Sequence, residues 1–187
     1  MDGLKDSLHC TQHKTPSGIF KKVRAFYDNF GGPLARAYYM CSNYHLLYEL
    51  HLQCQQKQKA LTFVIDRFYS STAAYTIGGQ TIGEQEEINT LYRDNPELFV
   101  WPHDLKRPDI IILLEADENV RMSRLSRRLV DSDANEYDVL LRKYKDLGKR
   151  IHRCIEVLQH VEVIDANRSA VDVLLQAKNV VAKMSKQ

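Results

Sequence analysis

Short apolar runs alternate with longer stretches of helical periodicity along the 187 residues of the chain. Two runs, at residues 61–65 and 109–114, are rich in apolar residues and bounded by polar ones, which predicts buried strands. Weaker strand candidates lie at residues 8–12 and 161–164. Strands that alternate with helices are typical of an α/β fold with a parallel sheet.

Helical patterns fill most of the remaining chain. They predict helices at residues 19–29, 33–59, from 71 onward, 119–129, 134–158 and 169–184. The segment 78–108 is poorly patterned, and we expect a surface excursion there with one short helix. Since no repeat, low-complexity tract or linker divides the sequence, residues 1–187 are expected to form a single domain.

Composition narrows the class of protein. The 26 Lys and Arg residues against 24 Asp and Glu leave a net charge of +2, which argues against a protein that coats nucleic acid. No run approaches the roughly 18 apolar residues of a membrane span. The four cysteines contain no C-x-x-C pair and are expected to be reduced thiols inside the cell. A zinc site at His9, Cys10 and His13 is not expected, because no further ligand is in view.

The first of the two apolar runs ends at Asp66 and Arg67, and a hydroxyl- and tyrosine-rich segment follows. The carboxyl end of a strand in a parallel sheet is where ligands bind. Asp66 can hold a sugar hydroxyl or a hydrated metal ion, and Arg67 offers a planar fork for phosphate. A surface ion pair is the alternative, but Ser71 and Tyr75 downstream favour a ligand site.

A second candidate site lies near the start of the longest predicted helix. Helical spacing places on one face the side chains of Arg36, Tyr39 or Met40, and Asn43. An aromatic side chain there can stack on a base, and Asn43 can read the hydrogen-bonding edge of that base. Packing of the tyrosines, Tyr44 included, in the core or at its boundary is the alternative interpretation.

The order Asp-Arg-aromatic followed by Ser-Thr-x-Ala-Tyr resembles the nucleotide-monophosphate signature of the thymidylate kinase family. The Asn43-Tyr44 pair and the Val-Trp-Pro-His-Asp-Leu-Lys-Arg-Pro-Asp stretch at residues 100–109 are similar to the mitochondrial-type UMP–CMP kinases, a branch of that family. Ordinary thymidylate kinases usually carry an arginine at the position of Tyr44. The resemblance implies a three-layer P-loop kinase-like α/β fold. It also implies transfer of the γ-phosphoryl group of ATP, with Mg²⁺, to a nucleoside monophosphate such as UMP, CMP or dTMP.

The resemblance also implies roles for individual residues. On the acceptor side, Asp66 and Arg67 would act in catalysis. The acceptor pocket would be shaped by Arg36, Tyr39, Asn43, Tyr44, Ser71 and Tyr75. A lid over the ATP phosphates would begin at Arg124, Arg127 and Arg128, and Asp165 would lie in the loop against which adenine rests. The alternative for these arginines is an ordinary solvated basic face of a helix, and this is the interpretation we adopt for the nearby Arg121. The alternative for Asp165 is an ordinary helix cap.

One part of the family pattern is missing from these 187 residues. A phosphate-binding loop requires G-x-x-x-x-G-K-[ST], whereas the Gly148-Lys149 pair is followed by Arg150 and lies in a predicted helix. The resemblance therefore begins after the family's first strand and phosphate loop, and we expect little or no kinase activity. Two outcomes stay open for the gap in the sheet: the strands at 61–65 and 109–114 pair directly, or the chain is a truncated product of limited stability.

The sequence thus predicts a nucleoside monophosphate kinase-like protein that is impaired on the donor side. A non-catalytic nucleotide-binding or interaction protein derived from the same family is the alternative. The expected partner is a nucleoside monophosphate. Neither nucleic acid nor a membrane is expected as a partner, and the sequence leaves open whether the chain forms a homodimer. An intracellular location is expected, cytoplasmic from the chain itself and mitochondrial if the family resemblance extends that far.

Overall fold

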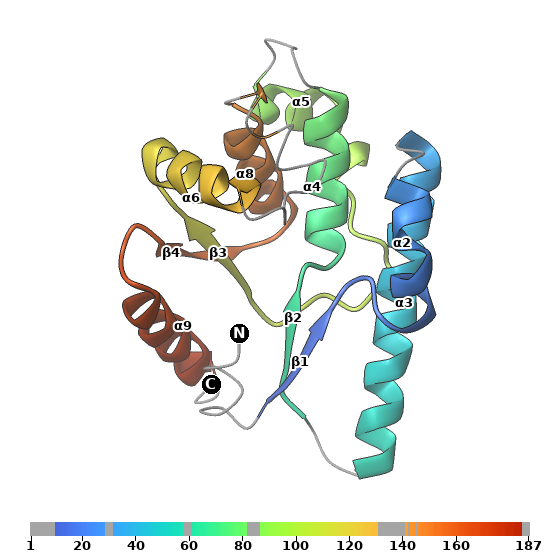
Figure 1. The fold of residues 1–187 in the computed structure, drawn as a ribbon. Coiled ribbons are helices and arrows are strands. Elements are labelled where there is room, and N and C mark those ends of the chain that lie inside the picture. The colour runs from blue at the N-terminus through green and yellow to red at the C-terminus, as the bar shows by residue number, and fades with distance from the viewer. Residues whose placement is uncertain are drawn as a thin grey trace.

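The computed structural model describes residues 10–28, 32–57, 61–81, 87–130, 141, 143–144 and 146–184, without the side chains of residues 25, 28, 80 and 128–130. Helices and parallel strands alternate along these residues, as the sequence predicts (Figure 1). Two of the strands, β1 (Thr11–Lys14) and β2 (Phe63–Asp66), lie between α9 (Ala170–Met184) on one side and the helices α2 (Gly18–Asp28) and α3 (Gly32–Lys57) on the other (Figure 1). The mixed α/β fold class with parallel strands is therefore confirmed.

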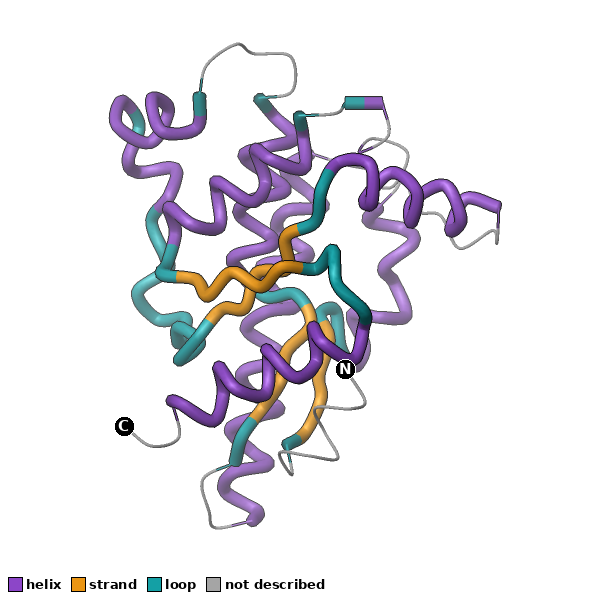
Figure 2. The backbone as a smooth tube through the Cα atoms, turned by 90° about the vertical axis from the view of Figure 1, so that its left-hand side faces the viewer, coloured by secondary structure: helices purple, strands orange, loops and turns teal. Residues whose placement is uncertain are grey.

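The strands form two separate pairs. Strand β1 (Thr11–Lys14) runs parallel to β2 (Phe63–Asp66), and β3 (Ile111–Glu115) runs parallel to β4 (Val161–Asp165). Figure 2 shows the two pairs running in different directions. Of the two outcomes left open for the gap in the sheet, direct pairing of the two buried strands is not observed: among the described residues, β2 pairs with β1 and β3 pairs with β4 in two separate sheets.

Helices join the two pairs instead. The chain leaves β2 into α4 (Tyr69–Gln80), which packs against α8 (Leu147–Leu158), the helix that leads into β4. Other described helices are α5 (Ile88–Asp94), the short 3₁₀ helix η1 (Pro96–Phe99) and α6 (Glu118–Val130). The predicted helix at 134–158 is too long, since Tyr144 and Asp146 are not helical and residues 134–140 lie outside the described part.

The segment predicted as a surface excursion belongs to the core. Ile88, Phe99, Trp101 and Leu105 are all at most 5% exposed and join the main hydrophobic cluster. The indole N–H of Trp101 donates to the carbonyl oxygen of Leu105 at 2.6 Å, and its ring lies edge-on to that of Tyr69. The prediction was wrong because these apolar residues follow no regular period, so the pattern did not show that they are buried.

No helix among the described residues is long and apolar enough to cross a membrane.

Candidate functional site

The turn after β2 carries a strained backbone conformation. Arg67 has φ of 64°, and it is the one non-glycine residue with positive φ in the described part of the chain. The left-handed region costs an L-residue roughly 1–2 kcal/mol relative to a right-handed conformation. Such strain persists only where the surroundings impose it, and it is concentrated at functional sites. The conformation places Arg67 between the last residue of β2 and the start of α4.

Thr15, at the end of β1, fixes this turn from the neighbouring strand. Its hydroxyl donates to the carbonyl oxygen of Arg67 at 2.7 Å, and its backbone N–H donates to that of Asp66 at 3.3 Å. Thr15 is 5% exposed, so this hydrogen bond is shielded from water. The carbonyl oxygen of the strained residue is therefore hydrogen-bonded by a residue that lies far away in the sequence.

The side chains of the turn leave a positive group facing solvent. The Asp66 carboxylate pairs with the ammonium group of Lys14 at 3.0 Å, so the ion pair at this strand end does not involve Arg67. The guanidinium of Arg67 lies over the ring of Tyr75, 5.1 Å from its centroid. Arg67 is exposed and forms no ion pair with any described residue, so its planar fork is available to an anion.

Asn43 and Thr72 connect α3 to α4. The Asn43 side-chain N–H group donates to the Thr72 hydroxyl at 3.1 Å, and Asn43 is fully buried. Its amide oxygen has no hydrogen-bond partner among the described residues. The structure therefore gives Asn43 a bridging contact between two helices, while its amide oxygen remains an unused acceptor.

A small cavity lies beside this contact. Its volume is about 130 Å³, and its walls come from α3, α4, α5 and the segments next to them, through Arg36, Met40, Tyr69, Thr72, Ala73, Thr76, Ile77, Thr81, Leu91 and Leu98. The Nε of Arg36 is buried and has no hydrogen-bond partner among the described residues. Of the residues predicted to shape the acceptor pocket, Arg36 is the one that lines this cavity.

The other predicted pocket residues lie elsewhere. Tyr39 packs edge-on to Tyr38, with ring centroids 4.9 Å apart. The Tyr44 hydroxyl donates to the Asp104 carboxylate at 2.7 Å, and this hydrogen bond, with smaller contributions from burial, raises the pKa of Tyr44 to about 12. Ser71 is half-buried on α4. The structure thus brings Arg67 and Tyr75 together, and Tyr39 and Tyr44 contact other residues, Tyr38 and Asp104.

The arginines of α6 lie on the other half of the molecule. Arg124 and Arg127 are exposed and line a shallow depression of about 290 Å³ with Asn119, Val120 and Ser123. Arg121 instead pairs with Glu118 at 2.6 Å. The side chain of Arg128 lies outside the described residues.

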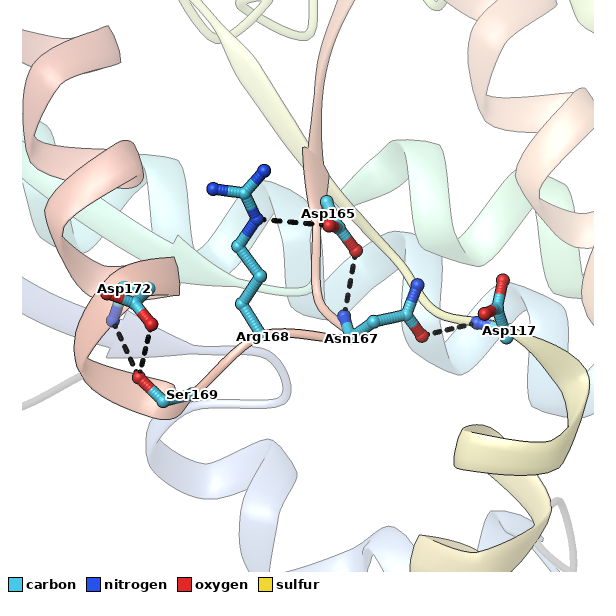
Figure 3. Close-up of polar contacts among 6 residues, drawn as sticks. All are labelled: Asp117, Asp165, Asn167, Arg168, Ser169 and Asp172. Atoms are coloured by element: carbon cyan, nitrogen blue, oxygen red, sulfur yellow. Dashed lines mark hydrogen bonds and ion pairs between the residues drawn. The ribbon is translucent and has the colours of Figure 1, made fainter.

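Asp165 ends β4 and organises the loop that follows (Figure 3). One carboxylate oxygen accepts the backbone N–H of Asn167 at 2.9 Å, and the other accepts from Arg168 at 3.1 Å. These two contacts, in that order, lower the pKa of Asp165. The alternative interpretation of Asp165 as a cap of the next helix is not borne out, because α9 begins at Ala170 and the hydroxyl of Ser169 accepts the N–H of Asp172.

Asn167 also joins this loop to the one that follows β3. Its amide oxygen accepts the backbone N–H of Asp117 at 2.8 Å (Figure 3). The backbone N–H of Ala166 donates to the carbonyl oxygen of Glu115 at 2.6 Å, which extends the β3–β4 ladder by one step. The carboxyl ends of β3 and β4 therefore form one connected polar surface.

A model of the thymidylate kinase family matches residues 21–177 of the chain. The chain belongs to the thymidylate kinase family. The match includes the turn at Arg67, the cavity and both polar loops, and it accounts for the α/β fold with parallel strands. A comparison with curated proteins finds no match.

Members of the thymidylate kinase family typically use ATP and Mg²⁺, and the residues on the donor side show how well this chain fits them. Gly148 and Lys149 lie in the first turn of α8, and a Cβ at Gly148 would meet the guanidinium of Arg121 at 3.0 Å. This crowded helical pair does not fit a phosphate cradle. Within the described residues, no group of three or more His, Cys, Asp or Glu side chains converges as a metal site.

Sequence reasoning missed several residues of this candidate site. Thr15 holds the strained turn, Lys14 pairs with Asp66, and Thr76 lines the cavity together with Thr72. The i, i+4 spacing of Thr72 and Thr76 is a local signal that could have placed both on one face of α4. No local signal identifies Thr15, because its partner lies 52 residues away.

Proposed function

We propose that this member of the thymidylate kinase family binds a nucleoside monophosphate at the carboxyl end of β2, with UMP, CMP or dTMP as the acceptor class. The observation that supports this most directly is Arg67. Its backbone is strained, its carbonyl oxygen is held by buried Thr15, and its guanidinium has no ionic partner among the described residues. Strained backbone conformations are concentrated at binding and catalytic sites, so a ligand for the Arg67 side chain explains why the strain is kept here.

Arg67 binds the acceptor phosphate in this proposal. A guanidinium matches phosphate oxygens through two parallel N–H donors, and the ring of Tyr75 limits the positions that the guanidinium can take. Asp66 and Lys14 lie at the same strand end, where Asp66 can accept a hydroxyl of the sugar. Phosphoryl transfer depends on positioning and on neutralising spread negative charge, and this turn offers both for the acceptor.

The donor side is proposed to be weak in the 187-residue chain. Arg124, Arg127 and Arg128 are the candidates for contact with donor phosphates, and Asp165 lies in the candidate adenine loop. None of them replaces backbone N–H groups that converge on phosphate, as a phosphate loop does. We therefore propose that the chain binds the acceptor and transfers little or no phosphate to it.

A coupled assay of ADP release, with CMP, UMP and dTMP as acceptors, tests the proposed weakness of transfer. We expect no turnover above the background ATPase rate for the purified 187-residue chain with ATP and Mg²⁺. Robust turnover would show that the proposed donor-side defect is wrong, while leaving the acceptor site intact.

The second candidate function is a non-catalytic nucleotide-binding protein, favoured by the absence of a G-x-x-x-x-G-K-[ST] motif from these 187 residues. Calorimetry with monophosphates and with ATP separates the two functions. Monophosphate binding without ATP binding supports the non-catalytic function. Binding of both ligands supports an enzyme, and failure of every monophosphate to bind would contradict the acceptor site itself.

A further inference from the structure

The cavity between α3 and α4 lies along α4 from the turn that carries Arg67. Thr72 and Thr76 line it, respectively five and nine residues after Arg67 in the sequence. Arg67 lies just before α4, and Tyr69, the first residue of this helix, also lines the cavity. The cavity and Arg67 therefore lie at the same end of α4, which lets one nucleotide place its phosphate at Arg67 and its base in the cavity.

The size of the cavity favours one ring. Its volume is about 130 Å³. An engineered cavity of about 150 Å³ in another protein binds benzene, whereas pockets for drug-sized ligands measure about 300–1,000 Å³. A pyrimidine base fits this scale better than the two fused rings of a purine.

Arg36 determines which hydrogen-bonding groups such a ring must present. Its Nε is buried without a partner among the described residues, and a buried N–H group without an acceptor is unfavourable. A guanidinium carries only donors and presents them as a planar fork. The group that satisfies Arg36 must therefore offer acceptors, and two adjacent acceptors would engage the fork best.

Cytosine is the pyrimidine that carries such a pair. Its O2 and N3 are neighbouring acceptors, whereas uracil and thymine carry an N–H donor at position 3 between two carbonyl oxygens. That donor would face the donors of Arg36. We propose that the cavity binds the base of the acceptor nucleotide and that Arg36 selects cytosine over uracil and thymine, an inference that rests on the proposed acceptor site.

Two further residues complete the recognition of cytosine. The hydroxyls of Thr72 and Thr76 line the cavity and can accept from the exocyclic amine of the base. The thioether of Met40 supplies a polarisable surface for the ring, a contact that sulfur makes favourably with aromatic groups. This assignment moves base reading from Asn43, which does not line the cavity, to Arg36.

Isothermal calorimetry of the 187-residue chain with CMP, UMP, dTMP and inorganic phosphate tests the proposal. A good bidentate contact discriminates between bases by about 5- to 150-fold, and we expect CMP to bind more tightly than UMP by a factor in this range. Arg36→Met and Arg36→Lys both remove the planar fork, and both should bind the three nucleotides with similar affinities. Arg93→Met is the matched control, because Arg93 is exposed on α5 and does not line the cavity; it should keep the preference.

The outcomes separate this inference from the function on which it rests. If no monophosphate binds the wild-type chain, the acceptor site is refuted and the cytosine preference with it. If the nucleotides bind without a preference, or if Arg36→Met keeps the preference, the base assignment alone is wrong. Equal weakening of CMP, UMP and inorganic phosphate by Arg36→Met would mark Arg36 as an anion site and also overturn the proposal.

A variant on α4 provides an independent readout should a thermal melt show that Arg36→Met is unfolded. Thr76→Val removes a hydroxyl acceptor from the cavity wall. It should weaken CMP binding more than UMP binding and so reduce the preference for CMP, since the hydroxyl accepts the amine that only cytosine presents. An equal effect on CMP and UMP would contradict the proposed orientation of the base.

Discussion

The turn after β2 and the loops after β3 and β4 occupy equivalent places at strand ends, yet they are held in different ways. Buried Thr15 fixes the first turn across 52 residues of sequence. The loop after β4 is held by exposed contacts between near neighbours, such as Asp165 with Asn167 and Ser169 with Asp172. Two contacts join distant residues there, from the Ala166 backbone N–H to Glu115 and from the Asp117 backbone N–H to Asn167.

This difference indicates which of the two regions keeps its geometry without a ligand. Buried contacts from distant elements fix a side chain more firmly than exposed local ones, because water competes with exposed contacts. The turn at Arg67, the proposed acceptor side, is therefore held in place without a ligand. The β3–β4 side offers a polar surface whose geometry depends on weaker contacts, so substitutions in the two regions should have unequal effects.

The largest effect is expected at Arg67. Arg67→Asn removes the guanidinium and should weaken monophosphate binding about 100-fold, the scale of losing charged hydrogen bonds. Asparagine adopts positive φ more readily than arginine, so the free energy of unfolding should stay unchanged or rise by up to about 1 kcal/mol. Calorimetry and denaturant unfolding measure the two quantities, with Arg67→Lys as the variant that keeps the charge. Unchanged binding in Arg67→Asn would show that another group holds the phosphate.

The next effect concerns the residue that holds this turn. Thr15→Val leaves the carbonyl oxygen of Arg67 without its buried donor, which should lower the free energy of unfolding by about 1–3 kcal/mol and weaken monophosphate binding about 10-fold. Thr15→Ser keeps the hydroxyl and should keep binding, although loss of a buried methyl group lowers stability by about 1 kcal/mol. Equal binding by Thr15→Val and Thr15→Ser would mean that this hydrogen bond does not position Arg67.

A smaller effect is expected on the opposite side. Ser169→Ala removes the cap of α9 and should lower stability by about 1 kcal/mol, whereas Ser169→Gly should cost only a few tenths. Monophosphate affinity should stay the same in both variants, since the cap lies outside the acceptor side. A change in affinity comparable to that of Thr15→Val would remove the proposed distinction between the two regions.

The smallest effect concerns Tyr44, which links α3 to the loop that leads to β3. Its hydrogen bond to Asp104 raises its pKa from 10.0 to about 12 in the folded protein. Because the folded pKa is the higher one, the bond stabilises the fold fully below pH 10, and this stability is lost as pH rises towards 12. Tyr44→Phe should therefore show a weaker loss of stability over this alkaline range. Parallel stability curves for the two proteins would contradict the linkage.

The hydrophobic pattern of the sequence predicted β2 and the position of Arg67 after it, but it did not predict that Thr15 holds this turn. The apolar run before Asp66 identified β2, and the abrupt change to polar residues located Arg67 at its end. The part played by Thr15 could not be predicted, because it depends on the register in which Lys14 lies opposite Asp66. The strand predicted at residues 8–12 was displaced from the observed β1 (Thr11–Lys14), and its first two residues lie outside the described part.

The cavity illustrates a second limit of sequence reasoning. Helical spacing placed Arg36 and Asn43 two turns apart on one face of α3 and made Asn43 the candidate for reading the edge of a base. In the structure Asn43 contacts Thr72 on α4, whereas Arg36 lines the cavity. Which of two residues on one helical face meets a neighbouring side chain depends on how the helices pack, and single-helix periodicity does not contain that information.

The separation of the strands into two pairs has a consequence for how the molecule opens. Two ladders that share no hydrogen bond among the described residues need not break together, so each can exchange its amide hydrogens as a unit of its own. A ligand bound at Arg67 would slow exchange in β1 and β2, because it stabilises only conformations in which that ladder is closed. Exchange of the amides in β3 and β4 would slow only to the extent that the packing of α4 against α8 transmits the stabilisation to these strands.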